Sequence, residues 1–157
     1  LKTLFTEDMG FRRSQLVSHL SLVEIPRSDR LVAVMDSAIN IAPDVAQKAT
    51  IIRNAVAVMH RIGIAEPKVA VLAATETPNP RMPESLDAAE LAAMNRRGEI
   101  PGCLVEGPLS YDLAMYPEAA GIKRVDSSVA GQVGFIGVVG GNRDADEVAA
   151  DGSLQAG

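Results

Sequence analysis

The sequence PKVAVLAATETPNP, residues 67–80, sets the architecture of this chain. It opens with a continuous apolar run (69–74), and a strand of this kind has both faces covered. We therefore expect a strand inside a sheet, with helices above and below it. The run stops at Thr75, and the polar, proline-containing stretch that follows is typical of a rigid loop. In open parallel sheets, ligands bind at this carboxyl end of the strands.

The composition favours an α/β protein and excludes several classes of partner. The 157 residues fit one domain, and with aromatic residues at only 3% the core must consist of smaller apolar side chains. A net charge of -5 predicts neither nucleic acid nor a membrane as a partner. Cys103 is the single cysteine, so we expect no disulfide, no cysteine-based metal site and a reducing cytoplasm. We expect neither a membrane span nor a leader sequence, because no apolar run approaches the roughly 20 residues of a span and the first residues lack a charged stretch followed by an apolar one.

The remaining pattern predicts a three-layer α/β domain with a mainly parallel sheet and an antiparallel hairpin near the N-terminus. The hairpin is expected from segments 19–25 and 31–35, which a short polar turn separates. The other expected elements are a helix capped by Asp44 and Gln47 and ending at Gly63, a helix from Ser85 or Asp87 to Gly98, a strand at 103–105, a helix at 112–120 that Pro117 shortens or divides, and a strand at 133–139.

Three polar or proline-bearing loops follow predicted strands, at residues 36–43, 75–80 and 106–112. If these strands are parallel and adjacent, the loops converge on one edge of the sheet, where an anion could bind. Near the N-terminus, Arg12 is either a solvated surface residue or a phosphate contact, since a guanidinium matches two phosphate oxygens at once. Walker, Gly-x-Ser-x-Gly, paired-histidine and cysteine-ligand motifs are absent, and Gly137–Gly141 matches a dinucleotide-binding turn only loosely.

The chain resembles the phosphate acetyl/butyryltransferase family, and within it the phosphate butyryltransferases. The resemblance rests on motifs that follow one another in family order between about residues 8 and 135. They are MGFR (9–12), SH (18–19), DSAINIAP (36–43), TETPNP (75–80), LDAA (86–89), EGPLSYD (106–112) and VAG (129–131).

The resemblance implies an enzyme that moves an acetyl or butyryl group between coenzyme A and inorganic phosphate, without a metal or a bound cofactor. It also implies an active site in a cleft between two α/β domains, and a homodimer or larger assembly. Arg12 is then expected to bind phosphate. Residues expected to border the cleft are Asp36, Asn40, Glu76, Asn79 and Asp112, and for the last three a capping or turn role is the alternative.

Two departures from the family pattern stand out. Ser128 takes the place of a proline in the family's Ser-Pro-Val-Ala-Gly sequence, and nothing after Gly131 matches the Ser-Arg region that the family associates with CoA binding. We therefore interpret residues 1–135 as the second, inserted domain of a phosphate acyltransferase and residues 136–157 as a divergent loop and tail. The alternative functions are a non-catalytic remnant or assembly module and, ranked last, a dinucleotide-binding domain.

Overall fold

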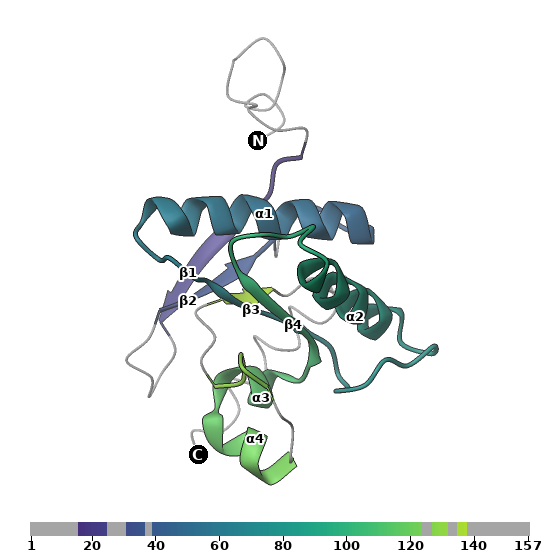
Figure 1. The fold of residues 1–157 in the computed structure, drawn as a ribbon. Coiled ribbons are helices and arrows are strands. Elements are labelled where there is room, and N and C mark those ends of the chain that lie inside the picture. Colours follow the sequence, from purple (N-terminus) through teal and green to yellow (C-terminus); the bar gives the residue numbers. More distant parts are fainter. Residues whose placement is uncertain (1–15, 25–30, 37–38, 124–126, 132–134, 138–157) are drawn as a thin grey trace, which may run out of the picture.

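The computed structural model describes residues 16–24, 31–36, 39–123, 127–131 and 135–137 (Figure 1). Strands and helices alternate over most of this part of the chain. In chain order the elements are β1 (Leu20–Glu24), β2 (Leu31–Met35), α1 (Val45–Arg61), β3 (Lys68–Leu72), α2 (Pro83–Arg96), β4 (Leu104–Leu109), α3 (Tyr111–Met115), α4 (Pro117–Lys123) and β5 (Phe135–Gly137).

The strands form one sheet in the order β1-β2-β5-β3-β4. β1 and β2 are the antiparallel hairpin, with Leu20 opposite Met35. β5 lies between β2 and β3 and is parallel to both, and β3 is also parallel to β4. The predicted α/β class, the mainly parallel sheet and the N-terminal hairpin are thus confirmed. The carboxyl ends of β2, β5, β3 and β4 all face the same edge of the sheet, as the loop positions predict.

β3 is the interior strand that its apolar sequence predicts. Val69, Ala70 and Val71 are at most 1% exposed although their side chains alternate between the two faces of the sheet. Figure 1 shows α1 along one side of the sheet and α2 beside β4, while α3 and α4 lie below the sheet, away from α1. The buried core joins β2, β3 and β4 to α1, α2 and α3.

Helix α1 begins where its capping sequence predicts. The Asp44 carboxylate accepts the backbone N–H of Gln47 (2.8 Å), and the Gln47 side chain accepts the N–H of Asp44 (2.9 Å). This reciprocal pair satisfies two donors that a helix start leaves open. Gly63 follows the helix with φ of 93°, the left-handed conformation expected of a terminating glycine.

Two boundaries differ from the sequence expectation, and one expected division is confirmed. α2 starts at Pro83 rather than at Ser85 or Asp87, because proline is already suited to the first turn of a helix. β4 continues through Leu109, so the expected loop from residue 106 is largely strand; a proline is tolerated there because β4 is an edge strand. The helix expected over residues 112–120 is divided, as Pro117 predicts, into α3 and α4.

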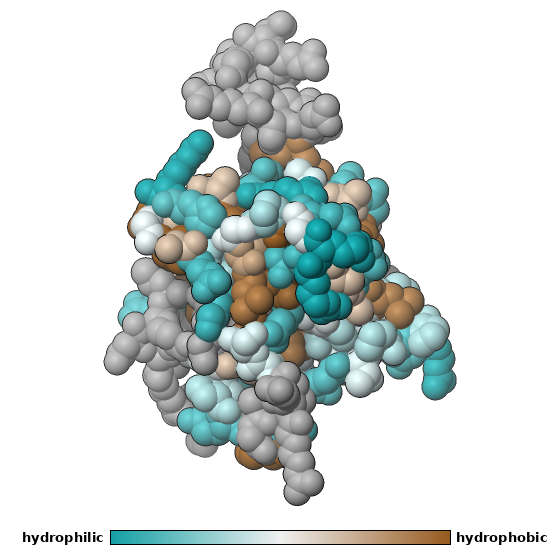
Figure 2. Space-filling model, viewed as in Figure 1, coloured by the Kyte–Doolittle hydropathy of each residue, from teal (hydrophilic) through white to brown (hydrophobic). Residues whose placement is uncertain are grey.

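The surface mixes polar and apolar residues. Figure 2 shows mainly hydrophilic residues with smaller hydrophobic areas among them. The most exposed large apolar side chains in the described ranges are Ile41 and Ile122, at 77% and 82%. Within the same ranges, no helix is both long and apolar enough to cross a membrane.

Candidate functional site

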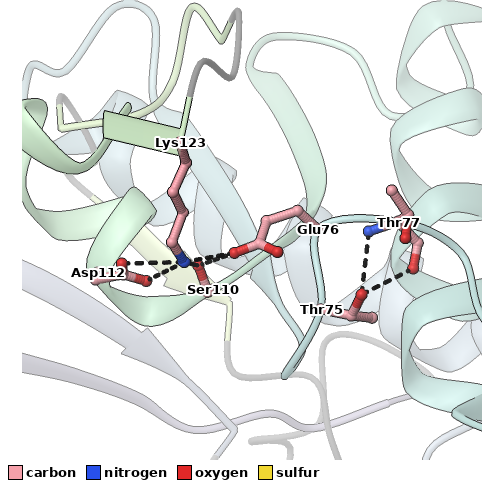
Figure 3. Close-up of polar contacts among 6 residues, drawn as sticks. All are labelled: Thr75, Glu76, Thr77, Ser110, Asp112 and Lys123. Carbon is pink, nitrogen blue, oxygen red and sulfur yellow. Dashed lines mark hydrogen bonds and ion pairs between the residues drawn. The ribbon is translucent and has the colours of Figure 1, made fainter. Parts of the chain in front are cut away.

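A cluster of four polar side chains lies at the carboxyl ends of β3 and β4 (Figure 3). Glu76 belongs to the loop after β3, and Ser110 and Asp112 stand at the junction of β4 and α3. Lys123 is the last residue of α4. The cluster therefore joins segments that are up to 47 residues apart in the sequence.

Lys123 is at the centre of this cluster. Its Nζ donates to Glu76 Oε1 (2.6 Å), to Ser110 Oγ (3.0 Å) and to Asp112 Oδ1 (3.2 Å). The Ser110 hydroxyl in turn donates to Glu76 Oε1 (2.7 Å). Figure 3 shows the Lys123 side chain reaching between Asp112 and Glu76, with Ser110 beside its tip.

These contacts fix the charge states of the cluster near neutral pH. Hydrogen bonds from Lys123 and Ser110 lower the pKa of Glu76, and the Ser110 hydroxyl and Lys123 ammonium lower the pKa of Asp112. The same carboxylates, Glu76 first, raise the pKa of Lys123. The cluster thus carries two negative charges and one positive charge. Groups whose pKa values are moved away from neutrality are poorer proton donors or acceptors at pH 7, so the arrangement is better suited to holding its partners than to transferring protons.

Replacing Lys123 with methionine should raise the pKa values of Glu76 and Asp112 back toward their ordinary values of 4.5 and 3.8. Because the folded state lowers the pKa values of both carboxyl groups, their ionised forms stabilise the folded state at pH values above the ordinary pKa values. This stabilisation is lost as the pH falls through the lowered pKa values of the folded state. For Lys123, whose pKa is raised above 10.5, the contribution is present at lower pH and lost at higher pH. Carbon-13 titration of the two carboxyl groups checks this expectation, and unchanged titration curves in the variant would contradict the ion pairs.

Asp36 and Asn40 form a second polar group, at the carboxyl end of β2. The Asn40 side-chain amide donates to Asp36 Oδ2 (2.6 Å) and to the carbonyl of Val17 (3.0 Å). Asp36 has φ of 53°, the one positive φ of a non-glycine residue in the ranges described. Its backbone N–H donates to the His19 carbonyl (2.8 Å), which ties β2 to the start of β1. Left-handed aspartates are uncommon and collect at functional sites, but here a structural role is also satisfied.

Asn79 has the turn role that its position in the proline loop suggests. Its side-chain Oδ1 accepts the backbone N–H of Arg81 (3.0 Å), and its own N–H donates to Ser85 Oγ (2.8 Å). The Ser85 hydroxyl, fully buried, donates to the Met82 carbonyl (2.7 Å). These bonds shape the entry into α2.

A third polar group joins residues 127–130 to β4. Glu106 of β4 accepts hydrogen bonds from the Ser127 hydroxyl and from the N–H (3.1 Å) and hydroxyl of Ser128. Ser127 Oγ also accepts the N–H groups of Val129 (3.2 Å) and Ala130 (2.9 Å). A proline at position 128 would have neither the N–H nor the hydroxyl, so two of these bonds depend on the departure from the family sequence.

Three further residues or segments singled out in the sequence are Arg12, the glycine-rich turn and Cys103. Arg12 lies outside the described residues, as do residues 138–141 of the glycine-rich turn. Burial raises the pKa of the Cys103 thiol to about 11, which suits a structural cysteine and not a nucleophile. In the residues that the structure describes, no group of three His, Cys, Asp or Glu side chains is placed to hold a metal ion.

The structure brings together Glu76 and Asp112, which the sequence suggested as cleft residues, through Lys123, which the sequence did not suggest. Lys123 belongs to none of the sequence motifs. Its position beside the loop after β3 depends on how α3 and α4 fold back after β4. Ser110 belongs to the EGPLSYD motif, and its position directly after a strand was the available signal. Glu106 belongs to the same motif, but its contacts with Ser127 and Ser128 were not expected, because position 106 was assigned to a loop.

Comparison with known proteins gives the family. A family model described as phosphate acetyl/butaryl transferase matches residues 10–135. Among curated relatives, the phosphate butyryltransferase of Clostridium acetobutylicum is 43% identical over 132 residues, 84% of this chain and 44% of that protein. The phosphate acetyltransferase of Rhizobium meliloti is 41% identical over 122 residues, 78% of this chain and 39% of the relative.

A solved structure shows the same fold. The branched-chain phosphotransacylase of Enterococcus faecalis V583 superposes with a TM-score of 0.86 at 30% identity, covering 98% of this chain and 54% of that one. The chain thus spans about half the length, or less, of the relatives it matches. The segments that follow β2, β3 and β4 at the carboxyl edge of the sheet lie within the matched residues, and the chain belongs to the phosphate acetyl/butaryl transferase family.

Proposed function

We propose that this chain takes part in acyl transfer between coenzyme A and inorganic phosphate, with an acetyl or butyryl group as the cargo: acyl-CoA + phosphate = acyl phosphate + CoA. The observation that carries the proposal is the family match over residues 10–135, which includes the segments that follow β2, β3 and β4 at the carboxyl edge of the sheet. Residues 1–135 would form the second, inserted domain of such an enzyme, with residues 136–157 as a divergent tail.

In this reaction a phosphate oxygen attacks the thioester carbonyl carbon. The carbonyl oxygen becomes negatively charged, the carbon–sulfur bond breaks, and the departing CoA thiolate takes up a proton. The site must therefore supply a cation for phosphate, hydrogen-bond donors for the oxyanion, and help for the leaving group.

The cluster around Lys123 does not supply the phosphate cation. The cluster has two carboxylates and one ammonium, so its net charge is negative. The Lys123 ammonium already donates to Glu76, Ser110 and Asp112. Phosphate thus needs a positive group from outside this cluster, and in the proposal that group is Arg12, as the family resemblance implies. In the proposal, Asp36, Asn40, Glu76, Asn79 and Asp112 border the cleft.

The remaining parts of the proposal follow from the same reaction. Acyl-CoA and phosphate are substrates, and no metal or bound cofactor is needed because a thioester is already activated. The net charge of -5 opposes binding to nucleic acid or an anionic membrane, and the single cysteine suits the cytoplasm. The intact enzyme would be a homodimer or a larger homo-oligomer.

The direct test is turnover by the purified chain. Butyryl-CoA or acetyl-CoA is incubated with phosphate, and released CoA is measured with a thiol reagent. Arg12→Ala should lower kcat/KM by about 100-fold or more, the usual effect of removing a donor that stabilises charge in the transition state. Arg61→Ala is the matched control, since Arg61 is an exposed arginine at the end of α1 and should leave turnover unchanged.

The outcome separates the two candidate functions. Turnover that Arg12→Ala abolishes supports the acyltransferase. A folded chain without phosphate-dependent CoA release would support the non-catalytic remnant or assembly module instead. Turnover that is equal in Arg12→Ala and wild type would remove Arg12 from the site while keeping the activity.

A further inference from the structure

Lys123 joins two segments that follow neighbouring parallel strands. An ammonium has three protons, and Glu76, Ser110 and Asp112 accept them at 2.6, 3.0 and 3.2 Å. Glu76 comes from the loop after β3, whereas Ser110 and Asp112 stand at the start of α3, directly after β4. Two links therefore hold these segments together: the Lys123 ammonium, which contacts both segments, and the hydrogen bond from the Ser110 hydroxyl to Glu76 (2.7 Å).

This arrangement makes Lys123 unsuitable as a direct phosphate ligand. With its three protons in use, the ammonium could bind a phosphate oxygen only by releasing Glu76 or Asp112. Its effect on a substrate is therefore indirect, through the segments that it fixes. The effect on Ser110 is the most direct, because its hydroxyl is held in one orientation: it accepts a hydrogen bond from Lys123 and donates one to Glu76 (2.7 Å).

Lys123 also limits the negative charge at this edge. With it, Glu76 and Asp112 leave one uncompensated charge, and without it they leave two. Both phosphate and the phosphate groups of CoA are anions. Like charges repel over about 8–10 Å at ordinary ionic strength, so an uncancelled carboxylate near the sheet edge would oppose both substrates.

We propose that Lys123 is a positioning residue of this edge: it fixes the Glu76 loop against the first turn of α3 and cancels one carboxylate charge, so that a phosphate-bearing substrate can approach. The substrate class rests on the proposed acyl transfer. The fixing of the two segments does not, and it can be measured on its own.

The three charged side chains of the cluster are too exposed for their ion pairs to contribute much to folding stability, which leaves substrate binding as their expected role. Glu76, Asp112 and Lys123 are 32%, 46% and 37% exposed. Ion pairs this exposed contribute little to folding because water screens them. A variant at position 123 should therefore remain folded, and circular dichroism checks this.

The experiment compares Lys123→Met, Lys123→Arg and the control Arg96→Met, which removes an exposed charge from the end of α2. With acyl-CoA and phosphate as substrates, Lys123→Met should raise the KM for phosphate roughly tenfold while kcat changes by less than about twofold. Added salt should shrink the increase, because screening weakens the repulsion. Lys123→Arg should restore most of the wild-type KM, and Arg96→Met should leave it unchanged.

Amide hydrogen exchange tests the fixing of the segments without any turnover. Exchange at residues 75–80 and 110–112 should be faster in Lys123→Met than in wild type, with α1 unchanged. If the wild-type chain is inactive, the acyl-transfer proposal fails and exchange alone decides the role of Lys123. Unchanged exchange at both segments overturns the inference, and so does turnover with an unchanged KM for phosphate.

Discussion

Replacing Gly131 with alanine should destabilise the fold by about 2 to 5 kcal/mol. Gly131 has φ of 66°, where a Cβ atom costs about 1–2 kcal/mol. That Cβ would also lie 2.6 Å from the Pro117 backbone at the start of α4, and such overpacking costs about 1–3 kcal/mol more. The N–H of Gly131 donates to the carbonyls of Leu113 and Ala114 (both 3.1 Å), so the residue cannot simply move away.

Gly98→Ala is the matched control for this variant. Gly98 has φ of 79°, but nothing lies within 4 Å of the place that an added Cβ would take, so only the backbone cost applies. Urea denaturation followed by circular dichroism should place the midpoint of Gly131→Ala clearly below that of Gly98→Ala. Equal midpoints would show that the close approach of Pro117 to Gly131 is not maintained in solution.

Replacing Asp87 with alanine should cost about 3 kcal/mol of folding stability. Asp87 of α2 accepts from Lys48 of α1 at 2.6 Å, and the Lys48 side chain is only 6% exposed. Without Asp87, a buried ammonium loses its partner in the contact between the two helices. The free energy of unfolding at neutral pH, measured with urea, gives the effect.

Three further variants test the cause of that loss. Lys48→Met removes the charge together with its need for a partner, so it should be much less destabilising than Asp87→Ala. Combining Lys48→Met with Asp87→Ala should recover much of the stability that Asp87→Ala loses. Glu90→Ala, which breaks an exposed pair with Arg97, should have little effect. Equal losses for Asp87→Ala and Glu90→Ala would contradict the role of burial.

Local patterns predicted much of the fold. The Asp44 and Gln47 capping pair, the interior position of β3 and the hairpin of β1 and β2 all follow from interactions between residues close in sequence or from the burial of an apolar run. The length of β4 did not follow, because a Gly-Pro pair usually signals a turn. Pairing of Leu109 with Leu72 in the sheet overrides that signal.

The candidate site was only partly predictable. The strand-end loops, and with them Glu76 and Asp112, are visible in the sequence because polar stretches interrupt apolar runs. Their connection through Lys123 is not visible, since it depends on how α3 and α4 turn back after β4. The anchor of Ser127 and Ser128 on Glu106 depends in the same way on contacts more than 20 residues apart.

The α/β class, the family and the edge of the sheet where polar residues gather can all be recognised in the amino-acid sequence, because they depend on periodicity, composition and ordered motifs. Three other features emerge only when the chain is folded: β5 enters between β2 and β3, Lys123 binds two carboxylates, and Gly131 must lack a side chain. These features are set by distances between segments remote in the chain, and no local pattern of residues encodes such distances.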